Sequence, residues 1–157
     1  MTISAINLSL SESDLLNILN FVFNKNGVSE SFSVKNISIN DNIKFQCSYK
    51  RWTTINFDFK VKINCIQDNI LHCEVFDIST KLLAIPSLFS NFGLNKYLAK
   101  LNQEGIKFNN DKIEIDFEVL LADFVRKTAY DCKLKVSNVY FSKNLIHFEL
   151  NQIAFSA

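Results

Sequence analysis

The chain has 157 residues, of which 48% are hydrophobic, and carries 17 Lys and Arg against 16 Asp and Glu. This length suits one domain with a substantial core, so we expect a single domain over 1–157. A net charge of +1 gives no field that would attract nucleic acid, and no apolar run is long enough to predict export or an integral membrane segment.

The first predicted element is a helix that begins after Ser11 and ends at Gly27. Residues 11–14 read S-E-S-D, which is typical of an N-cap followed by acids in the first turn. Glycine is typical just past the end of a helix. The apolar residues of this segment occupy most of its circumference and leave a narrow stripe of Asn.

An antiparallel meander is predicted next, with strands at 33–40, 43–52, 54–66 and 70–78. Asp-Asn pairs at 41–42 and 68–69 suit hairpin turns. Strict alternation along 55–65 predicts an unusually long strand with one buried face. Phe32 and Val34 are out of step with Ile37 and Ile39, which predicts a bulge near Asn36.

The second half of the chain repeats the order of helix and then strands. A second helix is predicted over Ser87 to Gln103, followed by a strand that carries Ile113 to Val119. A short helix at 120–128 and two strands at 130–141 and 145–155 complete the chain. The predicted fold class is α+β, with a long, curved antiparallel sheet wrapped around two main helices.

The four cysteines are Cys47, Cys65, Cys73 and Cys132, and each lies in the apolar phase of its segment. We therefore expect the cysteines to be small hydrophobic residues of the core, in a protein of the reducing cytoplasm. The alternative is a disulfide or a metal site, which the spacing does not favour because no C-x-x-C pair occurs.

Two histidines are the candidates for acid-base chemistry. His72 and His147 each have a glutamate two residues further on, Glu74 and Glu149, on the same strand face. A catalytic dyad and a surface cross-strand pair are both compatible with this spacing. The surface pair is favoured because no serine or cysteine nucleophile stands in a triad-like context.

Other charged and aromatic groups also have simple structural explanations. Alternation alone places Glu114, Asp116 and Glu118 on a solvated face, and the same holds for the pairs Lys60/Lys62 and Lys133/Lys135. Arg51-Trp52 would suit stacking on a ring of a ligand, but such a pair in a turn more often makes a structural contact at the protein surface. Three glycines form no phosphate-binding loop. We predict no enzymatic activity and no cofactor.

Two stretches carry a resemblance to a known superfamily: SESDLLNILNFVFNKNG before long strands, and IPSLFSNFGLNKYLAKLNQEGIKFNNDKIEIDFEVLLADF. Their order resembles that of the tubular lipid-binding (TULIP-like) superfamily, over most of the chain, and is similar to that of clostridial toxin-cluster accessory proteins. The resemblance implies a small bacterial protein that holds lipid tails between a twisted sheet and a helix.

Fifteen Phe and the wide apolar faces of the helices predict a function in hydrophobic binding. The expected ligand is a lipid or fatty-acid-like molecule in a groove between helices and sheet. The alternative is a structural or protein-interaction module with a filled core, which binds a protein or its own copy through sheet edges at Ile6 to Leu10 and the last strand. The predicted ligand-binding residues are Leu19, Phe23, Phe57, Phe59, Val61, Phe89, Phe92 and Leu98.

Overall fold

A computed structural model of the protein describes residues 2–3, 5–25, 27–50, 52–80, 105–109, 111–119 and 131–156. The second predicted helix, at 87–103, and the short one predicted at 120–128 lie outside these residues. So do three predicted ligand-binding residues, Phe89, Phe92 and Leu98.

Six antiparallel strands form a large sheet in the order β3-β4-β5-β6-β8-β7. The four of the meander are β3 (Phe32–Ile39), β4 (Ile43–Lys50), β5 (Thr54–Gln67) and β6 (Ile70–Thr80). The two that follow are β7 (Ile106–Asn109) and β8 (Lys112–Asp116). At 14 residues, β5 confirms the predicted long strand. The strand β7 was not predicted from the sequence.

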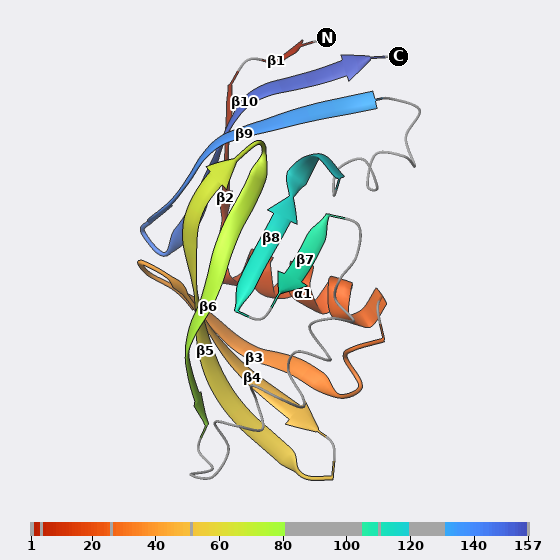
Figure 1. Cartoon of the computed structure of the whole chain (residues 1–157), viewed down its shortest axis with the longest axis vertical. Coiled ribbons are helices and arrows are strands. Elements are labelled where there is room, and N and C mark those ends of the chain that lie inside the picture. Colours follow the sequence, from red (N-terminus) through yellow and green to blue (C-terminus); the bar gives the residue numbers. More distant parts are fainter. Residues whose placement is uncertain are drawn as a thin grey trace.

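Four strands from the two ends of the chain form a small sheet. They are β1 (Thr2–Ile3), β2 (Ile6–Leu10), β9 (Asp131–Ser142) and β10 (Leu145–Ser156). Because β9 pairs along the whole of β10, the strands β1 and β2 follow one another along the opposite edge of β10. The last strand is therefore central, and the prediction that it forms an edge is wrong. Figure 1 shows β9 and β10 at one end of the molecule and the β4–β5 hairpin at the other.

The helix α1 (Glu12–Lys25) begins and ends as predicted. Ser11 Oγ accepts a hydrogen bond from the Asp14 N–H (3.2 Å), and the Ser11 N–H donates to Asp14 Oδ2 (2.9 Å). The side chain of each residue therefore accepts a hydrogen bond from the backbone N–H of the other. At the other end Gly27 has a φ of 65°. There the Val28 N–H donates to the Phe23 carbonyl (2.9 Å), the bond of a Schellman motif, and Val28 is 1% exposed.

Two hairpin turns have both central residues in the left-handed region, as a two-residue type I′ turn requires. Asp68 and Asn69 have φ of 50° and 66°, and Lys143 and Asn144 have φ of 53° and 59°. These turns connect β5 to β6 and β9 to β10 and confirm the turns predicted at 68–69 and 142–144.

Bulges decide which side chains face the core. The shift in register between Val34 and Asn36 confirms the predicted bulge, and it lets both Val34 and Ile37 be buried. A second shift, between Ile63 and Cys65, was not predicted. It reverses the parity of β5, so that Cys65 is exposed and Ile66 packs against the core. The prediction of a core Cys65 is therefore wrong, whereas Cys47 and Cys73 are buried.

The predicted arrangement of one sheet around two main helices is wrong. The protein is mostly antiparallel sheet, with only two short helical segments in the described part of the chain: α1 and a turn that begins at Phe117. Asp116 ends the predicted strand early, because its Oδ1 accepts hydrogen bonds from the N–H groups of Glu118 (3.0 Å) and Val119 (3.1 Å) and so caps this turn. The apolar face of the large sheet packs against α1 and against the small sheet. The sequence had predicted that all strands belong to one sheet.

Candidate functional site

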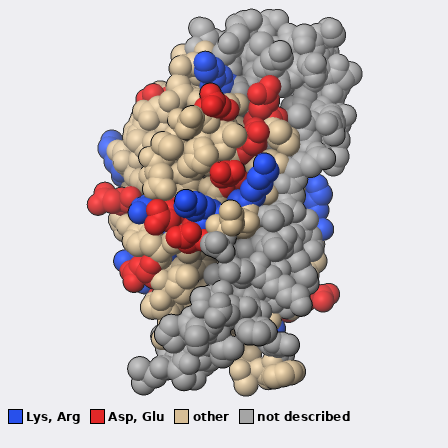
Figure 2. Space-filling view, in the orientation of Figure 1, with Lys and Arg blue, Asp and Glu red and all other residues tan. Residues whose placement is uncertain are grey.

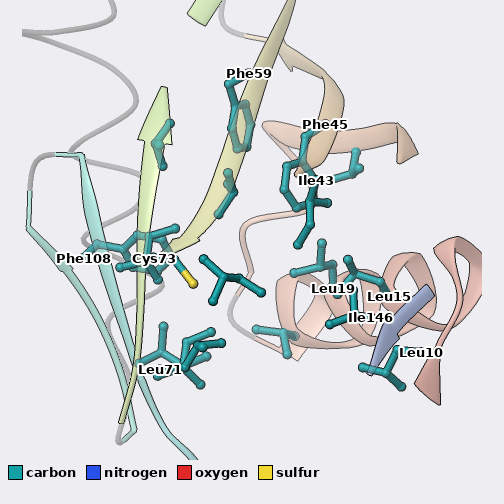
Figure 3. Close-up of a pocket in the computed structure, with 18 of the residues that line it drawn as sticks. Leu10, Leu15, Leu19, Ile43, Phe45, Phe59, Leu71, Cys73, Phe108 and Ile146 are labelled. Carbon is teal, nitrogen blue, oxygen red and sulfur yellow. The ribbon is translucent and has the colours of Figure 1, made fainter. Parts of the chain in front are cut away.

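An apolar cavity of about 210 Å³ lies between α1, the large sheet and the small sheet. Figure 3 shows Leu15 and Leu19 of α1, Ile43, Phe45 and Phe59 of the β4–β5 hairpin, and Leu71 and Cys73 of β6 around it. Every residue that lines it is hydrophobic. The full lining is Leu10, Leu15, Leu19, Val22, Phe23, Phe32, Val34, Ile43, Phe45, Phe59, Val61, Ile63, Leu71, Cys73, Val75, Ile106, Phe108, Ile113, Ile115, Ile146 and Phe148.

Five phenylalanine rings form a connected wall beside this cavity. Phe23 of α1 meets Phe32 edge-on, with centroids 5.3 Å apart, and Phe32 lies 5.9 Å from Phe57. Phe57 is in turn 6.1 Å from Phe59, which stacks on Phe45 at 4.9 Å. These separations are those of attractive aromatic pairs, so the rings of the wall pack against one another.

The structure brings together four of the predicted ligand-binding residues. Leu19, Phe23, Phe59 and Val61 all line the cavity. Phe57 is 2% exposed and lies behind Phe59 in the phenylalanine wall, not on the cavity itself.

Sequence reasoning missed the part of the lining that comes from strands distant in the chain. Phe108 and Ile113 belong to β7 and β8, and Ile146 and Phe148 to β10. The apolar phase of Ile113 was visible in the sequence. Nothing local indicated that β8 pairs with β6, or that β10 closes the space beside α1.

The chemistry of the cavity excludes polar recognition by the side chains that line it. Its most polar group is the Cys73 thiol, and burial, with a smaller contribution from Cys65, raises the pKa of Cys73 to about 12. This thiol therefore stays protonated at neutral pH and is a poor nucleophile. Apolar cavities of about 150 Å³ can stay dry and bind benzene, so a cavity of 210 Å³ can accommodate an apolar group larger than one ring.

Charged groups on the outer face of the large sheet pair across strands. Lys60 Nζ lies 2.6 Å from Asp77, and Lys62 Nζ lies 3.1 Å from Glu74. His72 Nδ1 lies 3.7 Å from Glu114 of β8, so its cross-strand partner is Glu114 and not Glu74. Both signs alternate on the face seen in Figure 2. Because Glu114 pairs with His72 while Asp116 caps a turn, the row of acids forms no converging carboxylate site.

His147 lies on the outer face of the small sheet. Its Nδ1 is 2.8 Å from Ser9 Oγ, its Nε2 is 3.2 Å from the Ser142 carbonyl, and its ring stacks on Tyr140 at 4.8 Å. Since a carbonyl only accepts, Nε2 is the donor in the hydrogen bond to Ser142. This is a well-satisfied cross-strand contact on an exposed surface. In the described residues, no group of three His, Cys, Asp or Glu side chains is placed to hold a metal ion.

No protein-family model, curated protein or solved structure matches the chain. The resemblance to the tubular lipid-binding superfamily thus stays a prediction. Over the described residues, no helix is both long and apolar enough to cross a membrane.

Proposed function

We propose that this protein binds a lipid or another hydrophobic ligand, without catalysis, in the apolar cavity between α1 and the two sheets. The observation that supports this is the cavity itself: about 210 Å³ of space bounded only by hydrophobic side chains. Protein interiors are ordinarily packed to crystal density, so an unfilled space of this size costs stability unless something occupies it.

The cavity volume sets the scale of affinity. Scaling from benzene in about 150 Å³, this cavity would hold roughly eight carbons. At about 0.8 kcal/mol for each buried methylene, they would contribute about 6 kcal/mol, which corresponds to a Kd on the order of tens of micromolar before ordering costs. A single acyl segment therefore suffices for measurable binding without a charged anchor.

Binding of a fluorescent fatty acid, together with native mass spectrometry of protein purified from cells, tests this proposal. The double substitution Leu19→Phe and Val61→Phe adds two rings to the cavity wall and should weaken binding at least about tenfold. Ile18→Phe is the matched control, since Ile18 neighbours Leu19 on α1 but is 46% exposed. This control should bind like the parent.

Melting curves keep the outcomes distinct. If the Leu19→Phe, Val61→Phe variant binds fatty acid as tightly as the parent, and both proteins melt normally, the proposal is contradicted. So would a parent protein that binds no fatty acid and carries no retained lipid.

A protein-interaction module is the second candidate, and one observation favours it. Ile18 and Phe21, three residues apart on the outer side of α1, are 46% and 66% exposed. Substitution of both by Ser would remove a partner that docks there, yet leave fatty-acid binding unchanged.

A further inference from the structure

Phenylalanine rings line the cavity on several sides. Six of them do so, one each from α1, β3, β4, β5, β7 and β10. They are Phe23, Phe32, Phe45, Phe59, Phe108 and Phe148. Figure 3 shows Phe45 and Phe108 at opposite sides of the space. An occupant of the cavity therefore meets aromatic rings from more than one direction.

These rings already take part in favourable aromatic pairs. Phe45 and Phe59 stack with centroids 4.9 Å apart and planes 20° apart, and Phe148 meets Phe117 edge-on at 5.7 Å. An aromatic ring in the cavity can continue the same stacked and edge-on contacts. Such contacts strengthen binding beyond the burial of apolar area, by about two- to twelvefold for each pair. A saturated chain gains only from the burial of area.

The cavity offers no partner to a charged group. No side chain that lines it contains nitrogen or oxygen, and the backbone polar groups of the paired strands β4, β5 and β6 are engaged in the ladders of the sheet. A carboxylate or an ammonium group placed inside would lose its hydration and gain no hydrogen bond in return. The charged head of any ligand must therefore stay outside, in water.

The size of the cavity also favours a rigid occupant. Scaled from benzene in about 150 Å³, the space holds roughly eight carbons. A saturated chain of this length has several rotatable bonds that become ordered on binding. An aromatic ring is rigid beforehand and loses less conformational freedom. Of two occupants of equal size, the ring binds at the lower entropic cost.

We infer that the group held in the cavity is an uncharged aromatic ring, in preference to a saturated acyl tail, and that anionic heads are kept outside. The preference for a ring rests on the proposed ligand-binding function, since it concerns the same cavity.

Two isomers separate the effect of charge from that of size. Methyl benzoate is neutral at pH 7, whereas phenylacetic acid, which has the same atoms, is an anion. Titration calorimetry should detect binding of methyl benzoate and binding of phenylacetate that is at least about a hundredfold weaker. Equal affinities for the two isomers would overturn the exclusion of charge.

Ethylbenzene and ethylcyclohexane have the same carbon skeleton and differ in aromaticity. Their transfer from water also differs, but this difference is common to all variants and cancels when the ratio of the two Kd values is compared between proteins. Phe59→Leu and Phe108→Leu each remove one ring from the lining and keep it apolar. Each should lower the preference for ethylbenzene over ethylcyclohexane about fivefold.

Phe76→Leu is the matched control. Phe76 lies on the outer face of β6, where its ring centroid is 6.0 Å from Lys60 Nζ and 5.9 Å from Lys62 Nζ. This control should keep the ratio of the parent. If Phe59→Leu and Phe108→Leu melt cooperatively and also keep that ratio, the preference for a ring is overturned.

Failure of the ring preference and failure of ligand binding are distinguishable. If neither fatty acid nor any of the neutral probes binds the parent, the proposed function fails and the ring preference fails with it. If fatty acid binds and the ratio is unchanged in both Phe59→Leu and Phe108→Leu, only the ring preference fails.

Discussion

Asn69 Oδ1 accepts a hydrogen bond from the backbone N–H of Val136 at 2.9 Å. Asn69 lies in the turn between β5 and β6 of the large sheet, and Val136 lies on β9 of the small sheet, where it is 3% exposed. This bond joins the two sheets where a sheet edge would otherwise leave a buried donor unsatisfied. The turn residue therefore has two roles, since it also adopts the left-handed conformation that the hairpin requires.

Asn69→Gly should lower the free energy of unfolding by about 1–2 kcal/mol, because glycine keeps the backbone conformation and removes the acceptor of the bond from Val136. Asn69→Asp is the matched control, since aspartate retains an acceptor oxygen and also tolerates a positive φ. Urea denaturation measures both. Equal stability of the Gly and Asp variants would show that the bond to Val136 contributes nothing measurable.

Cys65 should be the thiol that reacts rapidly with a disulfide reagent in the folded protein, because the bulge of β5 between Ile63 and Cys65 exposes it. Cys47 and Cys73 are buried and should react only on unfolding. The measurement is a time course of thiol release in a Cys132→Ser background. Cys65→Ser should abolish the fast phase there. A fast phase that persists would mean that Cys47 or Cys73 is accessible, and the absence of any fast phase before this substitution would mean that Cys65 is buried.

Alkaline pH should destabilise the protein through its two buried thiols. Burial, with a smaller contribution from Asp58, raises the pKa of Cys47 to about 12, and Cys73 reaches the same value. An unfolded chain releases these protons near pH 8.5, so above that pH the folded state binds more protons and stability falls by about 1.4 kcal/mol per pH unit for each thiol.

Replacement of both thiols, Cys47→Ala with Cys73→Ala, tests this pH dependence. The variant should be less stable at pH 7 because each change leaves a small cavity. Its stability should nevertheless fall less steeply than that of the parent between pH 8.5 and pH 11. Parallel stability curves for the two proteins over this range would contradict the prediction.

Ser11→Ala should destabilise the protein by about 1 kcal/mol, since it removes the N-cap of α1. Ser13→Ala, two residues on, is the comparison: it removes the hydroxyl that lies 2.9 Å from Ser11 Oγ but keeps the N-cap itself, and should have a smaller effect. Hydrogen bonds from the Ser11 side chain and backbone lower the pKa of Asp14, so the contribution of its carboxylate is present at neutral pH and lost as the pH falls through the lowered value. The difference between parent and Ser11→Ala in thermal melts should thus shrink in acid.

The sequence by itself determined the elements whose signals lie within a few residues. The N-cap at Ser11, the stop at Gly27, the turn at Asp68-Asn69 and the bulge near Asn36 all appear where the sequence predicted them. Each depends on a local conformational preference: a side chain that reaches its own backbone, or a residue that tolerates a positive φ.

Only the tertiary structure decided how these elements divide into two sheets and where space remains between them. The bulge between Ile63 and Cys65 is set by the pairing of β5 with β6, and the apolar alternation of β5 runs through it unbroken as far as Cys65. The cavity depends on β8 and β10, whose partners are distant in the chain. Alternation specifies that one face of a strand is buried; it does not specify which surface covers that face, because many apolar surfaces satisfy the same pattern.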